Sequence, residues 1–242
     1  MRILLIAGHG NGDCGAVGCG YKEADLTREM VKLIQPKLKN YATVEIADTS
    51  KNWYQHICKN GSKFNFKAYD YVLEIHFNAC VKDTKGNGVT TGTEIYVTTS
   101  EKGTTVEQAI VNNISALGLK NRGVKRYNWG LINHIKKQGV SCALLETCFI
   151  DDADDMKIYK SKKDKIAEAV ANGIVTAFGL KKTEVKQETG LYKDVPKNHW
   201  AYEGIKYATE KGYMTGYSGN TFKPEQPVSR AELATILKRI KA

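Results

Sequence analysis

The sequence is poor in several features that would place it in other protein classes. No apolar run approaches the roughly 20 residues that a membrane-spanning helix needs, so we expect no membrane span. The six cysteines form no Cys-x-x-Cys pair and no dense framework, which argues against a disulfide scaffold; zinc binding by Cys14 and Cys19 is a minor alternative. The amino-terminal apolar run lacks the length and cleavage site of a secretory signal, which predicts synthesis in the cytoplasm without a signal peptide.

Basic residues interleaved with aromatic ones are also missing, although the chain carries a formal net charge of +10. The short basic clusters, Lys162-Lys163 and Lys181-Lys182, do not lie among the aromatic side chains that a base-stacking surface needs. We therefore expect no nucleic-acid partner. The positive charge suits an anionic polymer at a cell surface equally well, because electrostatic attraction does not distinguish between polyanions.

Strand-like and helix-like segments alternate over the first 180 residues. Apolar runs bounded by turn residues are expected as strands at residues 2–7, 42–47, 69–77, 93–98 and 141–149. Apolar residues spaced as on one helix face are expected as helices at residues 26–38, 106–117 and 166–178. Such alternation is typical of an α/β fold with a mostly parallel sheet and helices on both faces.

The composition changes near residue 180 and predicts a second domain. Residues 179–190, GLKKTEVKQETG, are polar and charged, with too little apolar surface to pack, so we assign residues 180–190 as a linker. Residues 1–179 then form the first domain, and residues 191–242 form a small helical domain. Within it, Ser229 and Glu232 have the spacing of a capping box at the start of a helix.

Four side chains with catalytic chemistry stand at the ends of apolar runs or in the loop that follows one. His9 lies in a glycine-rich loop, Glu23 closes this loop, and His76 and Glu146 end two later runs. Because ligands bind at the carboxyl ends of parallel strands, we expect these side chains to meet at one edge of the sheet. Two histidines and one carboxylate form the ligand set of a catalytic zinc ion with one open position. Glu146 is then the expected general base of an amide or peptide hydrolase.

Other titratable residues have simpler interpretations. A histidine at a strand end is more often a hydrogen-bonded structural residue than a ligand, and this alternative stays open for His9 and His76. We expect His56, His134 and His199 to be structural or surface residues. The acids at positions 151, 152, 154 and 155 suit the N-terminal dipole of a helix better than a second metal site.

Three ordered motifs resemble those of the zinc-dependent N-acetylmuramoyl-L-alanine amidases: GHGNGDCGAVGCGYKEADL at residues 8–26, EIHFNA at residues 74–79 and ALLETCFIDDADD at residues 143–155. The resemblance spans roughly residues 2–178 and implies a zinc-exopeptidase-like fold. It also implies that His9, Glu23 and His76 bind one Zn²⁺ ion and that Glu146 is the catalytic base. The implied substrate is the amide that joins N-acetylmuramic acid to L-alanine in peptidoglycan.

The sequence departs from that family pattern at a few positions. Ile6-Ala7 replaces Asp-Pro before the Gly-His pair, and Cys148 stands where glycine is frequent. EIHFNA replaces the usual Ser-Ile-His-Ala-Asn-Ala. None of these changes removes an implied ligand or base, so they bear on loop detail and substrate fit.

Residues 191–242 resemble one S-layer homology repeat, with a DV pair followed by tryptophan, the turn GYSGNTFKP and the helix start SRAE. The resemblance implies binding to anionic secondary cell-wall polysaccharide, with Asp194, Trp200 and Arg230 at positions that the family uses. Nine Lys or Arg face five Asp or Glu in this segment, which suits such a glycan. Packing against a helix is an equally good interpretation of Trp200.

The repeat is incomplete as a family unit, because such repeats usually occur in threes. A single copy of about 50 residues is marginally stable alone. We favour self-association of this segment with other copies; docking on the first domain and weak binding are the alternatives.

Together these features predict a peptidoglycan amidase of the endolysin or autolysin type that acts at the bacterial cell wall after release. A zinc peptidase that cuts within the stem peptides would share the same metal site. A non-catalytic wall-binding protein would keep the fold and lose the chemistry. The presence of all four site residues argues against this last alternative.

Overall fold

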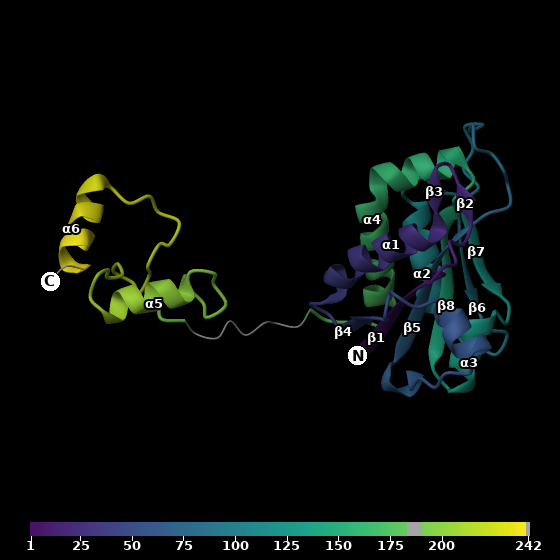
Figure 1. Cartoon of the computed structure of the whole chain (residues 1–242), viewed down its shortest axis with the longest axis horizontal. Coiled ribbons are helices and arrows are strands. Elements are labelled where there is room, and N and C mark those ends of the chain that lie inside the picture. Colours follow the sequence, from purple (N-terminus) through teal and green to yellow (C-terminus); the bar gives the residue numbers. More distant parts are fainter. Residues whose placement is uncertain (183–189, 241–242) are drawn as a thin grey trace. The chain divides into compact units, whose positions relative to one another are not determined.

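The computed structural model describes residues 1–182 and 190–240 (Figure 1). The chain forms two compact units, divided between residues 183 and 184. Most of the predicted linker, residues 183–189, lies outside the described residues. None of the helices in the described ranges combines the length and the apolar character that crossing a membrane requires.

The first unit is built on a six-stranded, mostly parallel sheet with the order β4-β1-β5-β8-β6-β7. Only the β6–β8 pair is antiparallel. The strands are β1 (Arg2–Ala7), β4 (Thr43–Ile46), β5 (Tyr71–Asn78), β6 (Thr93–Val97), β7 (Asn121–Arg126) and β8 (Ser141–Phe149). A short antiparallel pair, β2 (Val17–Gly18) and β3 (Tyr21–Lys22), lies in the glycine-rich loop.

Helices cover both faces of this sheet, as predicted (Figure 1). The helices α1 (Glu23–Leu38), α2 (Thr105–Ser115) and α4 (Ala153–Ala177) pack on one face and enclose the larger hydrophobic cluster. The helix α3 (Gly130–Lys137), one π-helical turn, η1 (Gln55–Lys59), and a 3₁₀ turn, η2 (Phe66–Ala68), cover part of the other face. The carboxyl-terminal parts of β5 and β8, and the loop after β1, carry the candidate site.

The sequence-based expectations located the central strands and missed peripheral elements. Strands at residues 2–7 and 141–149 have the predicted bounds, and β5 spans residues 71–78 where a strand at 69–77 was expected. Strand β7 and helix α3 were not predicted. Helix α4 begins much earlier than residue 166, because Asp152 caps it by accepting hydrogen bonds from the Asp154 and Asp155 amides.

The second unit has two helices, α5 (Tyr202–Glu210) and α6 (Arg230–Ile240). Its core is small and consists of four buried side chains, Tyr192, Val195, Ile205 and Phe222. The predicted capping box of α6 is confirmed. The Ser229 amide donates to Glu232 Oε2 at 2.8 Å, and the Glu232 amide donates to Ser229 Oγ at 3.2 Å. No residue of α6 is buried.

Candidate metal centre

His9, Glu23 and His76 converge above the carboxyl ends of β1 and β5. The Glu23 carboxylate lies between the two rings: Oε2 is 3.0 Å from His9 Nε2, and Oε1 is 2.9 Å from His76 Nδ1. The rings lie edge to face, with their centroids 4.9 Å apart. One ligand atom from each residue lies within 4.8 Å of the other two, so a single cation can contact all three.

The glycine-rich loop lets the backbone come close to these rings. A Cβ at Gly8 would lie 2.4 Å from His76 Cε1, and one at Gly15 would lie 2.7 Å from both Glu23 Oε2 and His9 Cδ2. His9 itself has φ of 59°, a conformation that is uncommon outside glycine and typical of functional sites. The Arg28 guanidinium donates hydrogen bonds to the carbonyls of Gly8 and His9 and so fastens this loop to α1.

A further carboxylate holds the second nitrogen of each histidine ring. Asp13 Oδ2 is 2.9 Å from His9 Nδ1, and Glu74 Oε1 is 3.1 Å from His76 Nε2. Asp13 is in turn held by the Asn52 side chain and the Gly15 amide. Carboxylates in this position fix the orientation and the tautomer of metal-binding histidines. Both histidines therefore present their remaining nitrogen to Glu23.

The charges at this centre stabilise one another. Burial opposes ionisation of Glu23, but hydrogen bonds from His76 and His9 outweigh it and hold the pKa of Glu23 far below its usual range. Burial disfavours the charged form of His76, but its hydrogen bonds to Glu23 and Glu74 raise its pKa well above the usual value. Burial also disfavours the charged form of His9, but the hydrogen bond and the negative charge of Glu23 outweigh it and raise the pKa of His9. The negative charge gathered here suits a cation.

Glu146 stands beside this cluster on the neighbouring strand. It pairs in register with His76, so the two side chains lie on the same face of the sheet. Its Oε2 atom is buried and has no hydrogen-bond partner among the described residues. Burial raises the pKa of Glu146 to about 7, against a partial offset from His76. A carboxylate with this pKa suits proton transfer near neutral pH.

Glu94 continues the row of His76 and Glu146 across the sheet. It pairs with Glu146 in the β6–β8 ladder and is almost completely buried. Its Oε2 atom accepts hydrogen bonds from Arg122 Nε and Lys125 Nζ, each at 2.5 Å. Its Oε1 atom accepts from the Tyr96 hydroxyl and the Asn78 amide, each at 2.8 Å. Glu94 is therefore neutralised and positioned, whereas Glu146 is not.

A second acidic cluster has a structural explanation. Asp83, Asp152 and Asp154 have carboxylate oxygens within 4.8 Å of one another. Asp152 caps α4 and accepts from Thr91, and Asp154 accepts from the amides of residues 87 and 88. These acids fasten the loop before β6 to the start of α4. Of the acids at positions 151, 152, 154 and 155, which were expected at a helix start, Asp152 is the N-cap of α4 and Asp154 and Asp155 lie in its first turn, as predicted.

The three residues singled out in the second unit do not come together. Asp194 accepts hydrogen bonds from the amides of Phe222 and Lys223 at 2.8 and 2.7 Å, so it fastens a turn. Trp200 is 86% exposed and stacks only on His199, which overturns the alternative of helix packing. Arg230 begins α6 and is exposed. Among the described residues, no hydrogen bond, ion pair or ring contact joins any two of them.

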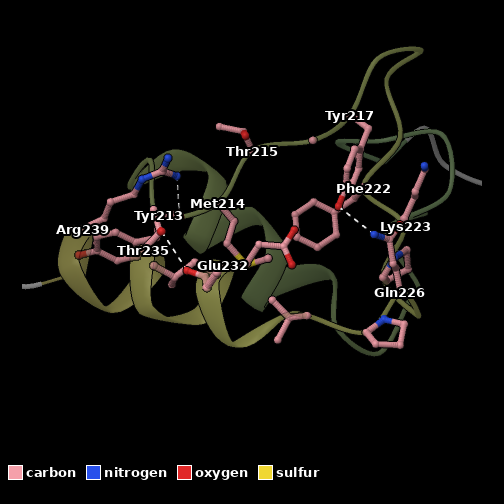
Figure 2. Close-up of a pocket in the computed structure, with 16 residues that line it drawn as sticks. Tyr213, Met214, Thr215, Tyr217, Phe222, Lys223, Gln226, Glu232, Thr235 and Arg239 are labelled. Carbon is pink, nitrogen blue, oxygen red and sulfur yellow. Dashed lines mark hydrogen bonds between the residues drawn. The ribbon is translucent and has the colours of Figure 1, made fainter.

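A pocket of about 540 Å³ lies instead between α6 and the connection that precedes it (Figure 2). Tyr217, Phe222 and Met214 provide its apolar wall, Lys223 and Arg239 provide positive charge, and Glu232 adds one carboxylate. The Lys223 ammonium lies 4.6 Å from the centre of the Tyr217 ring. An aromatic wall with cations beside it suits an anionic sugar.

Several functional side chains were missed by sequence reasoning. Two of them could have been found from their spacing in the sequence. Asp13 is the carboxylate four residues after His9, and Glu74 stands two residues before His76, on the same face of the same strand. Arg28 and Glu94 gave no local signal, because their partners lie on segments distant in the sequence.

Comparisons with known proteins agree with this geometry. Residues 3–176 match the family model described as N-acetylmuramoyl-L-alanine amidase, and residues 191–234 match the S-layer homology domain. The sporulation-specific N-acetylmuramoyl-L-alanine amidase of Bacillus subtilis is 31% identical over 200 residues, covering 80% of this chain and 73% of that protein. The endolysin of Bacillus phage SPP1 is 30% identical over 189 residues, covering 74% and 67%.

Among solved structures, the putative N-acetylmuramoyl-L-alanine amidase of Neisseria meningitidis superposes with a TM-score of 0.58 at 28% identity. The match covers 75% of this chain and 97% of that one.

Proposed function

We propose that His9, Glu23, His76 and Glu146 form the active site of this chain. The chain belongs to the N-acetylmuramoyl-L-alanine amidase family. It hydrolyses the amide bond between N-acetylmuramic acid and L-alanine in peptidoglycan. The observation that supports this assignment is the convergence of two histidines and one carboxylate beside an unpaired buried carboxylate. This is the donor set of a catalytic zinc site next to a general base.

The donor atoms fit one Zn²⁺ ion. His9 Nε2, His76 Nδ1 and a Glu23 oxygen would hold it, and the carboxylates of Asp13 and Glu74 would orient the two rings. When bound, zinc supplies Lewis-acid polarisation of the scissile carbonyl and of water.

Glu146 then performs the proton transfers. Its free Oε2 atom takes a proton from the attacking water and delivers it to the nitrogen of L-alanine as the amide bond breaks. Burial keeps its pKa near 7, so the same carboxyl group can accept and release this proton at neutral pH.

The reaction is tested by mass spectrometry of purified peptidoglycan digested with the full chain, with and without a zinc chelator. Stem peptides that begin at L-alanine and intact glycan strands are the expected products. Cleavage within the stem peptides would move the same site to the peptidase alternative.

Glu74 should contribute to metal binding although it would not touch the ion. We expect Glu74→Ala to weaken zinc affinity about 10- to 100-fold, since it frees the second nitrogen of His76. Competition with a fluorescent chelator measures this affinity directly. Glu168→Ala, an exposed acid on α4, is the control and should leave the affinity unchanged. Equal affinities in the two variants would mean that His76 is oriented by other contacts.

The second unit is an S-layer homology domain, and we propose that it holds the enzyme on the bacterial wall through an anionic secondary polysaccharide. The pocket beside α6 and the exposed Trp200 support this proposal. Asp194 is better explained as the residue that shapes the turn at positions 222 and 223, and Arg230 as an exposed cation near the pocket.

Deleting residues 191–242 should abolish co-sedimentation with purified walls and leave hydrolysis of soluble muramyl peptides intact. Within the full chain, Lys223→Ala should weaken wall binding about 10-fold or more, whereas Lys238→Ala, which removes the same charge outside the pocket, should not. Unchanged sedimentation of the deletion variant would refute the anchoring role.

We also propose that the single repeat associates with other copies through α6. Leu233, Leu237 and Ile240 are each about half exposed on this helix, and exposed apolar surface of this kind marks an interaction site. Sedimentation velocity of the full chain should show concentration-dependent association that Leu237→Glu removes and Ser218→Glu retains. A monomer at all concentrations would exclude self-association.

A further inference from the structure

An exposed aromatic surface lies next to the row formed by His76, Glu146 and Glu94, on the same face of the sheet. We call Tyr54, Tyr96, Tyr127 and Trp129 the aromatic ledge. Tyr54, Trp129 and Tyr127 are 41%, 45% and 55% exposed. Catalysis as described above uses none of them.

The ledge is a connected and fastened surface. The Trp129 ring contacts Tyr96 edge to face at 5.9 Å between centroids and contacts Tyr127 at 4.6 Å. Tyr54 lies against Gly130, where a Cβ would come within 2.3 Å of its ring. Asn128 lies between Tyr127 and Trp129, and its Oδ1 atom accepts a hydrogen bond from the Thr99 amide at 3.0 Å. The rings are therefore preorganised before any ligand arrives.

The ledge begins one side-chain row from Glu146. Tyr96 stands two residues after Glu94 on β6, and Glu94 pairs with Glu146. At about 3.3 Å per residue, the two rows are roughly 7 Å apart. The Tyr96 hydroxyl also donates to Glu94 at 2.8 Å. A substrate with its amide at Glu146 has one of its two halves within reach of the ledge.

We propose that the ledge is the subsite for the glycan strand of peptidoglycan and stacks a neutral N-acetylated pyranose ring next to the scissile amide. This inference rests on the proposed function of the site and names the part of the substrate that is bound. An exposed ring face with a hydroxyl or indole N–H at its rim matches a sugar, which has an apolar C–H face and polar edges. Of the cations near the ledge, Arg122 and Lys125 are paired with Glu94, and the Lys59 ammonium lies over the Tyr54 ring, 5.5 Å from its centre. The two cations paired with Glu94 offer no free partner to the charged groups of a stem peptide.

Binding without turnover tests this subsite. The probe is a neutral, peptide-free oligosaccharide of N-acetylglucosamine, titrated into the full chain by calorimetry. Trp129→Ala and Tyr127→Ala should each weaken binding about 10-fold or more, and Trp129→Phe should restore most of it. Tyr207→Ala is the matched control, since Tyr207 is 56% exposed but lies on α5.

Kinetics with purified peptidoglycan complete the test. The ledge variants should raise KM and leave kcat nearly unchanged, because the ledge binds the substrate away from the reacting atoms. Undiminished glycan affinity in both alanine variants would overturn the proposal while leaving the amidase assignment intact. If the two alanine variants instead lose affinity for the isolated stem peptide and keep their affinity for the glycan, the ledge binds the peptide. Glycan binding in a chain that releases no stem peptide would contradict the proposed function and not the ledge.

Discussion

Glu146→Gln should lower the rate of amide hydrolysis by about 10²- to 10⁴-fold, the range that a general acid–base residue contributes. Glutamine keeps the size of the side chain but cannot accept the proton of water. The zinc content should stay unchanged, because the three expected ligands are untouched. Release of stem peptides and metal analysis of the same sample measure both quantities. Normal hydrolysis by this variant would show that another group is the base.

The same residue determines a pH dependence. The base must be ionised, so kcat/KM should rise with pH, reach half of its maximum at or below about pH 7, the pKa of Glu146 without a metal, and level off above that midpoint. Stability should respond in the opposite direction. The folded protein binds this proton more tightly than the unfolded chain, so ionised Glu146 destabilises the fold increasingly as pH rises from about 4.5 to 7.

Removing the charge should therefore stabilise the metal-free protein at high pH. Glu146→Gln should have a higher Tm than the parent chain at pH 8 and nearly the same Tm at pH 4. Thermal unfolding at both pH values, in the presence of a chelator, makes the comparison. An equal Tm at pH 8 would indicate that Glu146 is well solvated when ionised.

His76→Ala should have the second large effect, a loss of bound zinc. We expect the affinity to fall by more than about 100-fold, beyond the 10- to 100-fold change typical of an outer carboxylate, because one of three protein ligands is gone. Hydrolysis should fall with the metal content. Metal analysis after dialysis provides the measurement.

The control for this experiment is His134→Ala. His134 lies on α3, away from Glu23, and its loss should leave the zinc content intact. A full complement of zinc in dialysed His76→Ala would remove His76 from the ligand set. Loss of zinc from both variants would point to general destabilisation instead.

The sequence by itself determined the type of fold, and it predicted that His9, Glu23, His76 and Glu146 come together at one edge of the sheet. The strands at residues 2–7 and 141–149 are nearly continuous apolar runs, as expected for strands buried on both faces, and a local pattern is enough to find them. His9 and Glu23 were found because a glycine-rich loop lies between them, and such loops bring backbone close to a ligand.

Elements at the edge of the sheet could not be found in this way. Strand β7, NRGVKR, is polar and contains glycine, and only its pairing with β6 makes it a strand. Helix α3 has eight residues, too few for a clear apolar period. Helix α4 was predicted too short, because its first turns are rich in lysine and are held by the Asp152 cap.

Only the tertiary structure decided which residues surround the central four. Glu74 reads as a charged residue inside an apolar strand, yet its place two residues before His76 puts it against that ring. Glu94 and the aromatic ledge reach Glu146 through the antiparallel β6–β8 pairing. The physical reason is that strand register depends on contacts between segments far apart in the chain, and a local pattern carries no information about them.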